Sequence, residues 1–178
     1  LPQIKQSRVM TNYDGSMSAI VTIAHELGHA YHGHMIENLS LLNTSYTMPV
    51  AETASTFCEN IVFNAAMKKA SPSEQQLLLE NSISDLCQII VDISSRYHFE
   101  RRKNEFLSSE DLNKIMIDAQ LKTYGDGLDP DYLHPNMWIC KGHYYSGNLS
   151  YYNFPYAFGG LFALGLYAQF QDQGENFV

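Results

Sequence analysis

The sequence predicts a mostly α-helical fold, and three observations support this prediction. Apolar residues recur at helical spacing in several long segments. Strong helix-start signals precede these segments, for example Ser71-Pro72-Ser73-Glu74, a capping box with proline in the first turn. The chain has no series of alternating strand-like segments, no internal repeat and no low-complexity linker. We therefore expect a single helical domain over residues 1–178, with at most one short edge strand or hairpin.

The first well-patterned segment is a half-buried helix that begins after a turn near residue 15. Residues 8–13 before it could form a short strand. The turn offers three candidate helix caps, Asp14, Ser16 and Ser18. Gly33 is expected to end the helix. Its apolar face is formed by Ile20, Val21, Ile23, Ala24, Leu27 and Ala30.

Two more helices are expected between residues 49 and 106. Pro49 stands where a first-turn proline belongs, after a polar loop over residues 38–47, and opens a helix to about Lys69. The capping box at Ser71 then starts a long third helix that runs towards Phe106. Its apolar positions are Leu77, Leu78, Ile83, Leu86, Ile89, Ile90, Ile93 and Tyr97.

The C-terminal third of the chain is expected to be helical with a long interruption. Ser108-Ser109-Glu110-Asp111 starts a fourth helix, and the turn-forming run 125–130 ends it. A short helical piece around Met137-Trp138 and a loop over residues 142–148 follow. A final helix is predicted from near Pro155 to about Phe170.

Composition excludes two classes of partner. An apolar fraction of 45% with 17% charged residues is typical of a globular chain. The net charge of −8 argues against a nucleic-acid surface. Arg101-Arg102-Lys103 is flanked by Glu100 and Glu105, so we interpret it as a solvated helix face. The longest nearly apolar run, 154–168, is shorter than the roughly 20 residues of a membrane span, so no membrane partner is expected.

The cysteines and the N-terminus indicate a cytoplasmic location. Cys58, Cys87 and Cys140 are odd in number and widely spaced, without a C-x-x-C pair. We expect them to be buried thiols in a reducing compartment. The first residues do not show the charged-then-apolar pattern of an export signal.

The most informative motif is His25-Glu26-Leu27-Gly28-His29. Positions four apart stand on one face of a helix, so His25 and His29 can converge on one ion with Zn–N bonds of about 2.0–2.1 Å. Glu26 is rotated by about 100° and can face a water bound to the same ion. The alternative is a core helix whose histidines are satisfied by backbone carbonyls.

A catalytic zinc site needs a third protein ligand. The metzincin pattern fails, because His32 and Met35 stand where a glycine and a third histidine would be required. Glu52 is placed for this role, on a run of small residues that would let two helices pack closely. The alternative explanation for Glu52 is a glutamate in the first turn of a helix, where the helix dipole favours a negative charge. Glu59, two turns on, competes with it, and we expect Glu59 to orient one of the histidines.

Several sequence blocks, in order and spacing, resemble the thimet oligopeptidase and oligoendopeptidase F family of zinc metallopeptidases. The resemblance implies a helical zincin-type catalytic domain with His25, His29 and Glu52 as zinc ligands and Glu26 as general base. It also implies that a histidine and tyrosines of the C-terminal loop contact the substrate carbonyl. The blocks are His25–Ala30, Glu52–Phe57, Arg96–Glu100, Tyr124–Asp129, His143–Tyr145 and Tyr152–Gly159.

Family members are several times longer and carry a large helical part ahead of the zinc helix. Only 24 residues precede His25 in this chain. We therefore expect the C-terminal catalytic portion of a longer peptidase, with the N-terminal part of the same protein as a partner.

The segment from His143 to Tyr156 carries five tyrosines and a histidine. Phenol hydroxyls stay protonated at neutral pH and can donate hydrogen bonds to an oxyanion. His143, Tyr152 and Tyr156 are our candidates for catalytic and substrate-binding contacts, although the choice between Tyr151 and Tyr152 stays open. The alternative is aromatic packing, and it applies most to Tyr144, Tyr145 and Tyr151.

Together these features predict a zinc-dependent endopeptidase that hydrolyses short peptides, with one Zn²⁺ per chain and Glu26 as general base. A zinc carboxypeptidase or dipeptidase is the alternative enzyme, but it would need an arginine clamp that the tyrosine-rich loop lacks. A third possibility is an inactive, metal-stabilised helical fragment that docks on the missing N-terminal part through an exposed apolar face.

Overall fold

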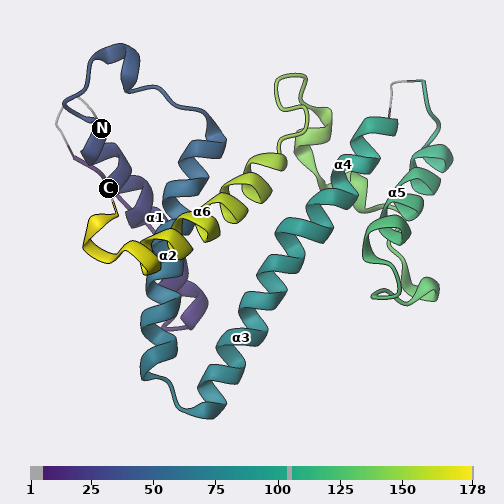
Figure 1. Ribbon diagram of the computed structural model, residues 1–178. Coiled ribbons are helices and arrows are strands. Elements are labelled where there is room, and N and C mark those ends of the chain that lie inside the picture. The colour runs from purple at the N-terminus through teal and green to yellow at the C-terminus, as the bar shows by residue number, and fades with distance from the viewer. Residues whose placement is uncertain (1–5, 104–105, 178) are drawn as a thin grey trace. The chain divides into compact units, whose positions relative to one another are not determined.

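The computed structural model describes residues 6–103 and 106–177, and all regular elements in these ranges are helical (Figure 1). The short strand expected at residues 8–13 is wrong, because this segment has no strand partner among the described residues. The chain divides into two compact units, Leu1–Leu79 with Phe158–Val178, and Glu80–Ala157.

The first helix, α1 (Met17–Ile36), confirms one of the three predicted caps. The side chain of Ser16 accepts a hydrogen bond from the Ala19 N–H at 3.1 Å. The prediction that Gly33 ends the helix is wrong. Gly33 does not adopt the left-handed backbone of a C-terminal glycine, and the last turn closes at Glu37, whose N–H donates to the carbonyl of His34.

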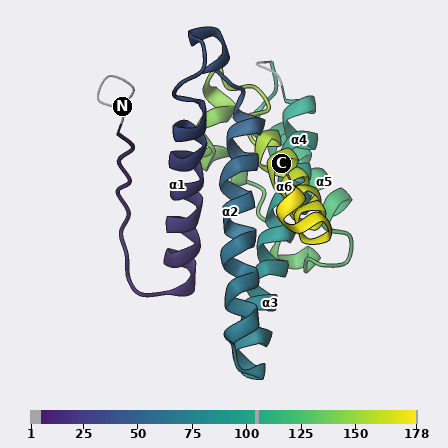
Figure 2. The ribbon, with the colours of Figure 1, turned by 60° about the vertical axis from the view of Figure 1, so that its left-hand side comes forward.

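Helix α2 (Met48–Lys69) begins as predicted, with Thr47 as N-cap and Pro49 in its first turn. A single 3₁₀ turn, η2 (Leu41–Asn43), interrupts the polar loop before it. Helices α1 and α2 lie side by side in both views (Figures 1 and 2). This pair forms the frame of the first unit.

The long helix predicted from Ser71 towards Phe106 is built from three consecutive segments. They are α3 (Pro72–Cys87), the π-helical segment η3 (Gln88–Asp92) and α4 (Ile93–Arg102). At the start, the Ser71 N–H donates to the Glu74 carboxylate at 2.8 Å, as the capping box predicts. The helix stops before Phe106 because Lys103 adopts extended backbone.

The second unit has its core between α4 and α5 (Ser109–Tyr124). Helix α5 opens with the predicted capping box of Ser108 and Asp111 and ends at Gly125, whose φ is +58°. The predicted helical piece near Met137 is confirmed as the 3₁₀ turn η5 (Met137–Cys140). The buried core residues are Phe99, Ile115, Met116, Ala119 and Tyr144.

The expected loop at residues 142–148 contains a further 3₁₀ turn, η6 (Gly142–Tyr145). It forms because Tyr144 is buried in the core of the second unit, with its ring 5.0 Å from that of Phe99. Before it comes another short turn, η4 (Pro130–Tyr132).

The final helix, α6 (Phe154–Gln173), confirms the prediction and is followed by η7 (Gly174–Asn176). From Phe158 onwards it belongs to the first unit, where Ala163 is fully buried. Tyr167 and Phe170 pack with the ring of Phe57 on α2. In the described part of the chain, no helix has the length and apolarity needed to cross a membrane.

The prediction of buried cysteines is wrong for two of the three. Cys58 is half-buried on α2, whereas Cys87 and Cys140 are exposed, and all three are free thiols. The two exposed thiols are the last residues of α3 and η5.

Candidate metal centre

Three side chains from α1 and α2 converge in the first unit. The Nε2 atoms of His25 and His29 lie 3.2 Å apart, and His25 Nε2 lies 3.5 Å from Glu52 Oε2. The ligand atoms of all three residues lie within 4.8 Å of one another. The structure therefore brings together the ligand set that the sequence predicts.

Two of the three separations match those of a tetrahedral metal site, while the group as a whole spans up to 4.8 Å. With bonds of about 2.0–2.1 Å, two ligands of a tetrahedral zinc ion lie about 3.3–3.4 Å apart. The measured 3.2 and 3.5 Å lie on either side of that value. The imidazoles face each other and a carboxylate, so the alternative of histidines satisfied by backbone carbonyls does not describe this site.

Burying the Glu52 carboxylate costs free energy unless a cation balances its charge. It is only 6% exposed. The polar contacts of its carboxylate, with His25 Nε2 and the Ser55 hydroxyl, are both long at 3.5 Å. A buried carboxylate needs a charged or strongly hydrogen-bonded partner. The donor set of two imidazoles and one carboxylate supplies the coordination that zinc uses at catalytic sites.

Glu59 contacts His25 from the side opposite to the candidate site. Its Oε1 atom accepts a hydrogen bond from His25 Nδ1 at 2.5 Å, as the sequence analysis expected of this residue. A proton on Nδ1 leaves the Nε2 lone pair directed at His29 and Glu52. The same hydrogen bond is the main cause that raises the pKa of His25, while burial opposes the rise and the charges of Glu52 and Glu26 add to it.

Two glycines explain how the ligands come so close. A Cβ on Gly28 of α1 would lie 2.8 Å from Ser55 Cα and 3.0 Å from the Ala54 oxygen on α2. A Cβ on Gly159 of α6 would lie 2.7 Å from the Glu52 Cβ. Both sites therefore require a residue without a side chain. The small residues after Val50 serve the close packing that the sequence predicts.

Glu26 follows His25 on α1 and is half-buried. Its charge acts on the His25 imidazole, since it helps to raise the pKa of that ring. The three-residue ligand group found in the described part of the chain does not include Glu26. The role of Glu26 as a general base stays a prediction.

The tyrosine-rich segment belongs to the second unit, where it forms a cluster of its own. The hydroxyls of Tyr152 and Tyr156 lie 2.9 Å apart. The ring of His143 lies 5.7 Å from that of Tyr152, and its Nε2 atom lies 2.8 Å from Asn153 Nδ2. The structure thus groups the three candidates that the sequence predicts in this segment.

The other tyrosines of the segment have packing roles. Tyr144 is a core residue, and burial raises its pKa well above the usual range of a phenol. Tyr145 is 62% exposed, and its hydroxyl donates to the carbonyl of Trp138. Tyr151 has a left-handed backbone with φ of 57°, and its ring packs against Tyr97. The choice between Tyr151 and Tyr152 as a substrate contact stays a prediction.

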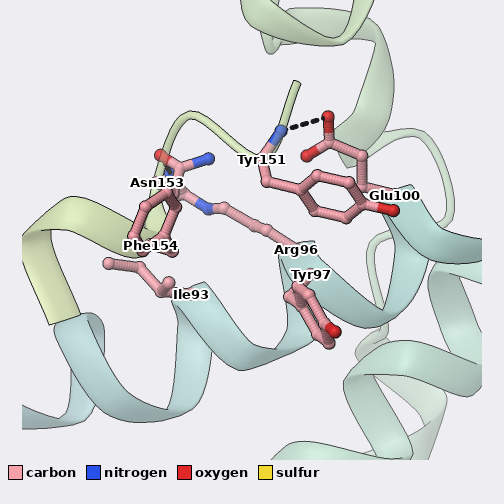
Figure 3. A pocket seen from close by; sticks show the side chains of 7 residues that line it. All are labelled: Ile93, Arg96, Tyr97, Glu100, Tyr151, Asn153 and Phe154. Atoms are coloured by element: carbon pink, nitrogen blue, oxygen red, sulfur yellow. Dashed lines mark hydrogen bonds between the residues drawn. The ribbon is translucent and has the colours of Figure 1, made fainter. Parts of the chain in front are cut away.

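Sequence reasoning assigned no role to three polar residues near His143, which are the half-buried Arg96 and the buried Glu100 and Asn153. Arg96 of α4 extends its side chain towards Asn153, and both line a small pocket with Glu100 and Tyr151 (Figure 3). The Tyr151 N–H donates to the Glu100 carboxylate at 2.8 Å in this pocket. Arg96 also pairs with Asp92. The spacing of Asp92 and Arg96 by one helical turn could have revealed that pair, but Asn153 is 57 residues away in the chain.

The chain is similar in sequence to known peptidases. The sequence model of Peptidase family M3 matches residues 2–178. Oligoendopeptidase F of Lactococcus lactis subsp. cremoris is 28% identical over 159 residues, which are 85% of this chain and 26% of the relative. Group B oligopeptidase PepB of Streptococcus agalactiae is 24% identical over the same shares of the two chains.

A homologue of oligoendopeptidase F from Borreliella burgdorferi is 26% identical over 179 residues, or 96% of this chain and 30% of the relative. The chain thus spans between a quarter and a third of the length of these relatives. No solved structure matches it significantly.

Proposed function

Since this chain belongs to Peptidase family M3, we propose that it forms the zinc-binding catalytic part of an endopeptidase acting on short peptides. The convergence of His25, His29 and Glu52 is the observation that supports this proposal most directly. The relatives are three to four times as long as this chain, and the proposal is that the complete protein carries a further N-terminal part. We propose that part as the partner of this chain.

In this proposal the first unit holds the metal and moves the proton. His25, His29 and Glu52 would hold zinc, and Glu59 would keep the His25 ring oriented. Bound zinc supplies Lewis-acid chemistry that polarises a carbonyl and lowers the pKa of water to about 7. The Glu26 carboxylate would accept the proton of the attacking water and deliver it to the amine of the departing peptide.

The cluster in the second unit would contribute hydrogen-bond donors. His143, Tyr152 and Tyr156 carry N–H or O–H groups suited to the oxygen of the scissile carbonyl, on which negative charge develops. Loss of one such donor typically costs about 10²–10³ in rate. These donors would therefore act on kcat more than on KM.

A carboxypeptidase or dipeptidase requires a cation for the terminal carboxylate of the substrate. The arginine that contacts the tyrosine-rich segment in the second unit is Arg96, and its guanidinium is engaged by Asp92 and Asn153. Residues 142–156 contain neither lysine nor arginine. Lys103, a second cation at this segment, is also engaged, since its Nζ donates to the Tyr144 carbonyl at 2.8 Å. With both contacting cations engaged, we favour an endopeptidase.

The first experiment measures metal content. We expect about one zinc per chain, lost in His25→Ala and retained in Glu26→Gln, because Glu26 is not part of the ligand group. His34→Ala is the matched control, since His34 lies on the same helix with 69% of its side chain exposed. Zinc retained in His25→Ala would contradict the proposed ligand set.

The second experiment measures cleavage of an internally quenched peptide blocked at both ends. We expect Glu26→Gln to abolish cleavage, while Glu110→Gln, an exposed change on α5, leaves it intact. Cleavage that survives Glu26→Gln would overturn the proposed base. A zinc-loaded chain that cleaves only after the N-terminal part of the longer protein is added would identify a docking module.

A further inference from the structure

We infer that Asn153, itself held by Arg96, keeps His143 as the neutral imidazole with its proton on Nδ1, so that Nδ1–H is the group offered to a substrate oxygen. Arg96 and Asn153 would then be positioning residues that act through His143. The substrate part of this inference rests on the proposed function. The tautomer itself depends only on contacts within the second unit.

The donor and acceptor roles follow from the chemistry of the three side chains. Arg96 Nη1 lies 3.2 Å from Asn153 Oδ1. A guanidinium can only donate, so the oxygen of the Asn153 amide must be the atom that faces it. The amide nitrogen then faces His143 Nε2 at 2.8 Å. Because this NH₂ group can only donate, Nε2 must accept, and the ring proton belongs on Nδ1.

Arg96 is fixed in turn from its own helix. It forms an ion pair with Asp92, one turn earlier, and both residues are largely buried. The hydroxyl of Tyr124 donates to Asp92 Oδ1 at 3.2 Å, which holds the carboxylate from α5. Asp92 closes the π-helical segment η3, and such segments occur frequently at functional sites.

Burial stabilises these contacts, because water has little access to the groups that make them. Asp92 is 7% exposed and Asn153 is 8% exposed, so neither amide nor carboxylate can exchange its partner freely with water. The hydrogen bond from Asn153 fixes the tautomer of His143 whether or not the ring contacts a substrate. The effect of the tautomer on kcat therefore distinguishes a positioning role from a structural one.

The charges around His143 favour the same neutral form. Burial is the main cause that lowers the pKa of His143 below its ordinary value. The cations that face the ring lower the pKa further, and one carboxylate raises it. The cations are Arg96, Lys103 and Lys141, and the carboxylate is Glu100.

The decisive test is the variant Asn153→Asp. A carboxylate has nearly the shape of the amide but can only accept, so His143 Nε2 must now carry a proton. Asn148→Asp is the matched control, because Asn148 is an exposed residue of the same loop. The measurement is long-range ¹H–¹⁵N NMR of the full chain with ¹⁵N-labelled histidine, and the His143 signals are assigned by their loss in His143→Gln.

We expect Nδ1–H with an unprotonated Nε2 in the wild-type chain and in Asn148→Asp, with a titration midpoint below about 6.5. In Asn153→Asp we expect a proton on Nε2 and a higher midpoint, because the new carboxylate stabilises the cation. A wild-type ring with its proton on Nε2 would overturn the inference. This result is read from the wild-type chain itself, and His143→Gln serves only to assign the signals.

Activity provides the second readout. With the blocked peptide, at a pH above the titration midpoint of the variant, the neutral His143 ring of Asn153→Asp carries its proton on Nε2 and offers no Nδ1–H donor. We therefore expect kcat to fall by about 10²–10³ with little change in KM, because this donor acts mainly on the transition state. A tautomer that changes without any change in kcat would overturn the substrate part of the inference. Failure of the proposed function would look different, since Glu26→Gln would then leave cleavage unchanged while the NMR result stands.

Discussion

The close approach of α1 and α2 at Gly28 allows a quantitative prediction. In Gly28→Ala, the added Cβ would lie 2.8 Å from Ser55 Cα, 3.0 Å from the Ala54 oxygen and 3.1 Å from Cys58 Cβ. Carbon atoms pack at about 3.5–4.0 Å, so the helices must separate by about 0.7 Å or more. The first two obstacles are backbone atoms and cannot rotate away.

This separation would distort the candidate metal centre. His25 and His29 lie on α1 and Glu52 lies on α2, three residues before Ser55. Zinc–ligand distances must hold within about 0.2 Å, so a shift of this size exceeds what the site tolerates. We expect zinc affinity to fall by about 10–100-fold, the loss typical of a disturbed ligand environment.

Stability should respond less than metal affinity. Overpacking costs about 1–3 kcal/mol, and alanine returns about 1 kcal/mol of helix propensity relative to glycine. The matched control is Gly33→Ala on the same helix, where a Cβ would have no neighbour within 4 Å. We expect that variant to be slightly more stable and to bind zinc normally.

The assays are competition with a zinc-binding dye and urea unfolding of the metal-free chain. Gly28→Ala and Gly33→Ala should differ clearly in the first assay and modestly in the second. Wild-type zinc affinity in Gly28→Ala would refute the argument that this glycine sets the spacing of the ligands.

Three further predictions concern single side chains. Glu59→Gln should lower the pKa of His25, because the hydrogen bond from that ring to Glu59 is the main cause of its raised pKa. The same change should weaken zinc binding about 10–100-fold. An unchanged pKa in an NMR titration and an unchanged zinc affinity in a dye competition would contradict this prediction. Glu52→Gln should remove stoichiometric zinc, yet make the metal-free chain at least as stable in urea, because it eliminates a buried charge; a zinc-loaded variant would contradict the ligand assignment. Ser108→Ala removes the capping box of α5 and should cost about 0.5–2 kcal/mol in urea unfolding without affecting zinc binding, and a stability equal to wild type would show that the cap is dispensable.

Most of the helical architecture could be predicted because its signals are local. Ser16, Pro49 and Ser108 satisfy the first backbone N–H groups of their helices or pre-set their geometry, so they act within one turn. The predictions that failed needed tertiary information. Gly33 could have ended α1 only by adopting a left-handed backbone, and residues 8–13 could have formed a strand only with a partner.

The sequence by itself determined that two imidazoles share one helix face with a carboxylate beside them, because four-residue spacing acts within a single helix. It also favoured Glu52 as the third candidate ligand over Glu59, which lies two turns further along α2. The tertiary structure placed the two carboxylates, since the contact of Gly28 with Ser55 sets the register of α1 against α2. Glu52 consequently faces Nε2 of His25, and Glu59 faces Nδ1.

The chain of contacts from Asp92 through Arg96 and Asn153 to His143 was likewise decided by tertiary structure. Its central link joins residues 57 positions apart, and no local periodicity connects them. Helical spacing reveals which side chains share a face, but packing alone determines which faces meet.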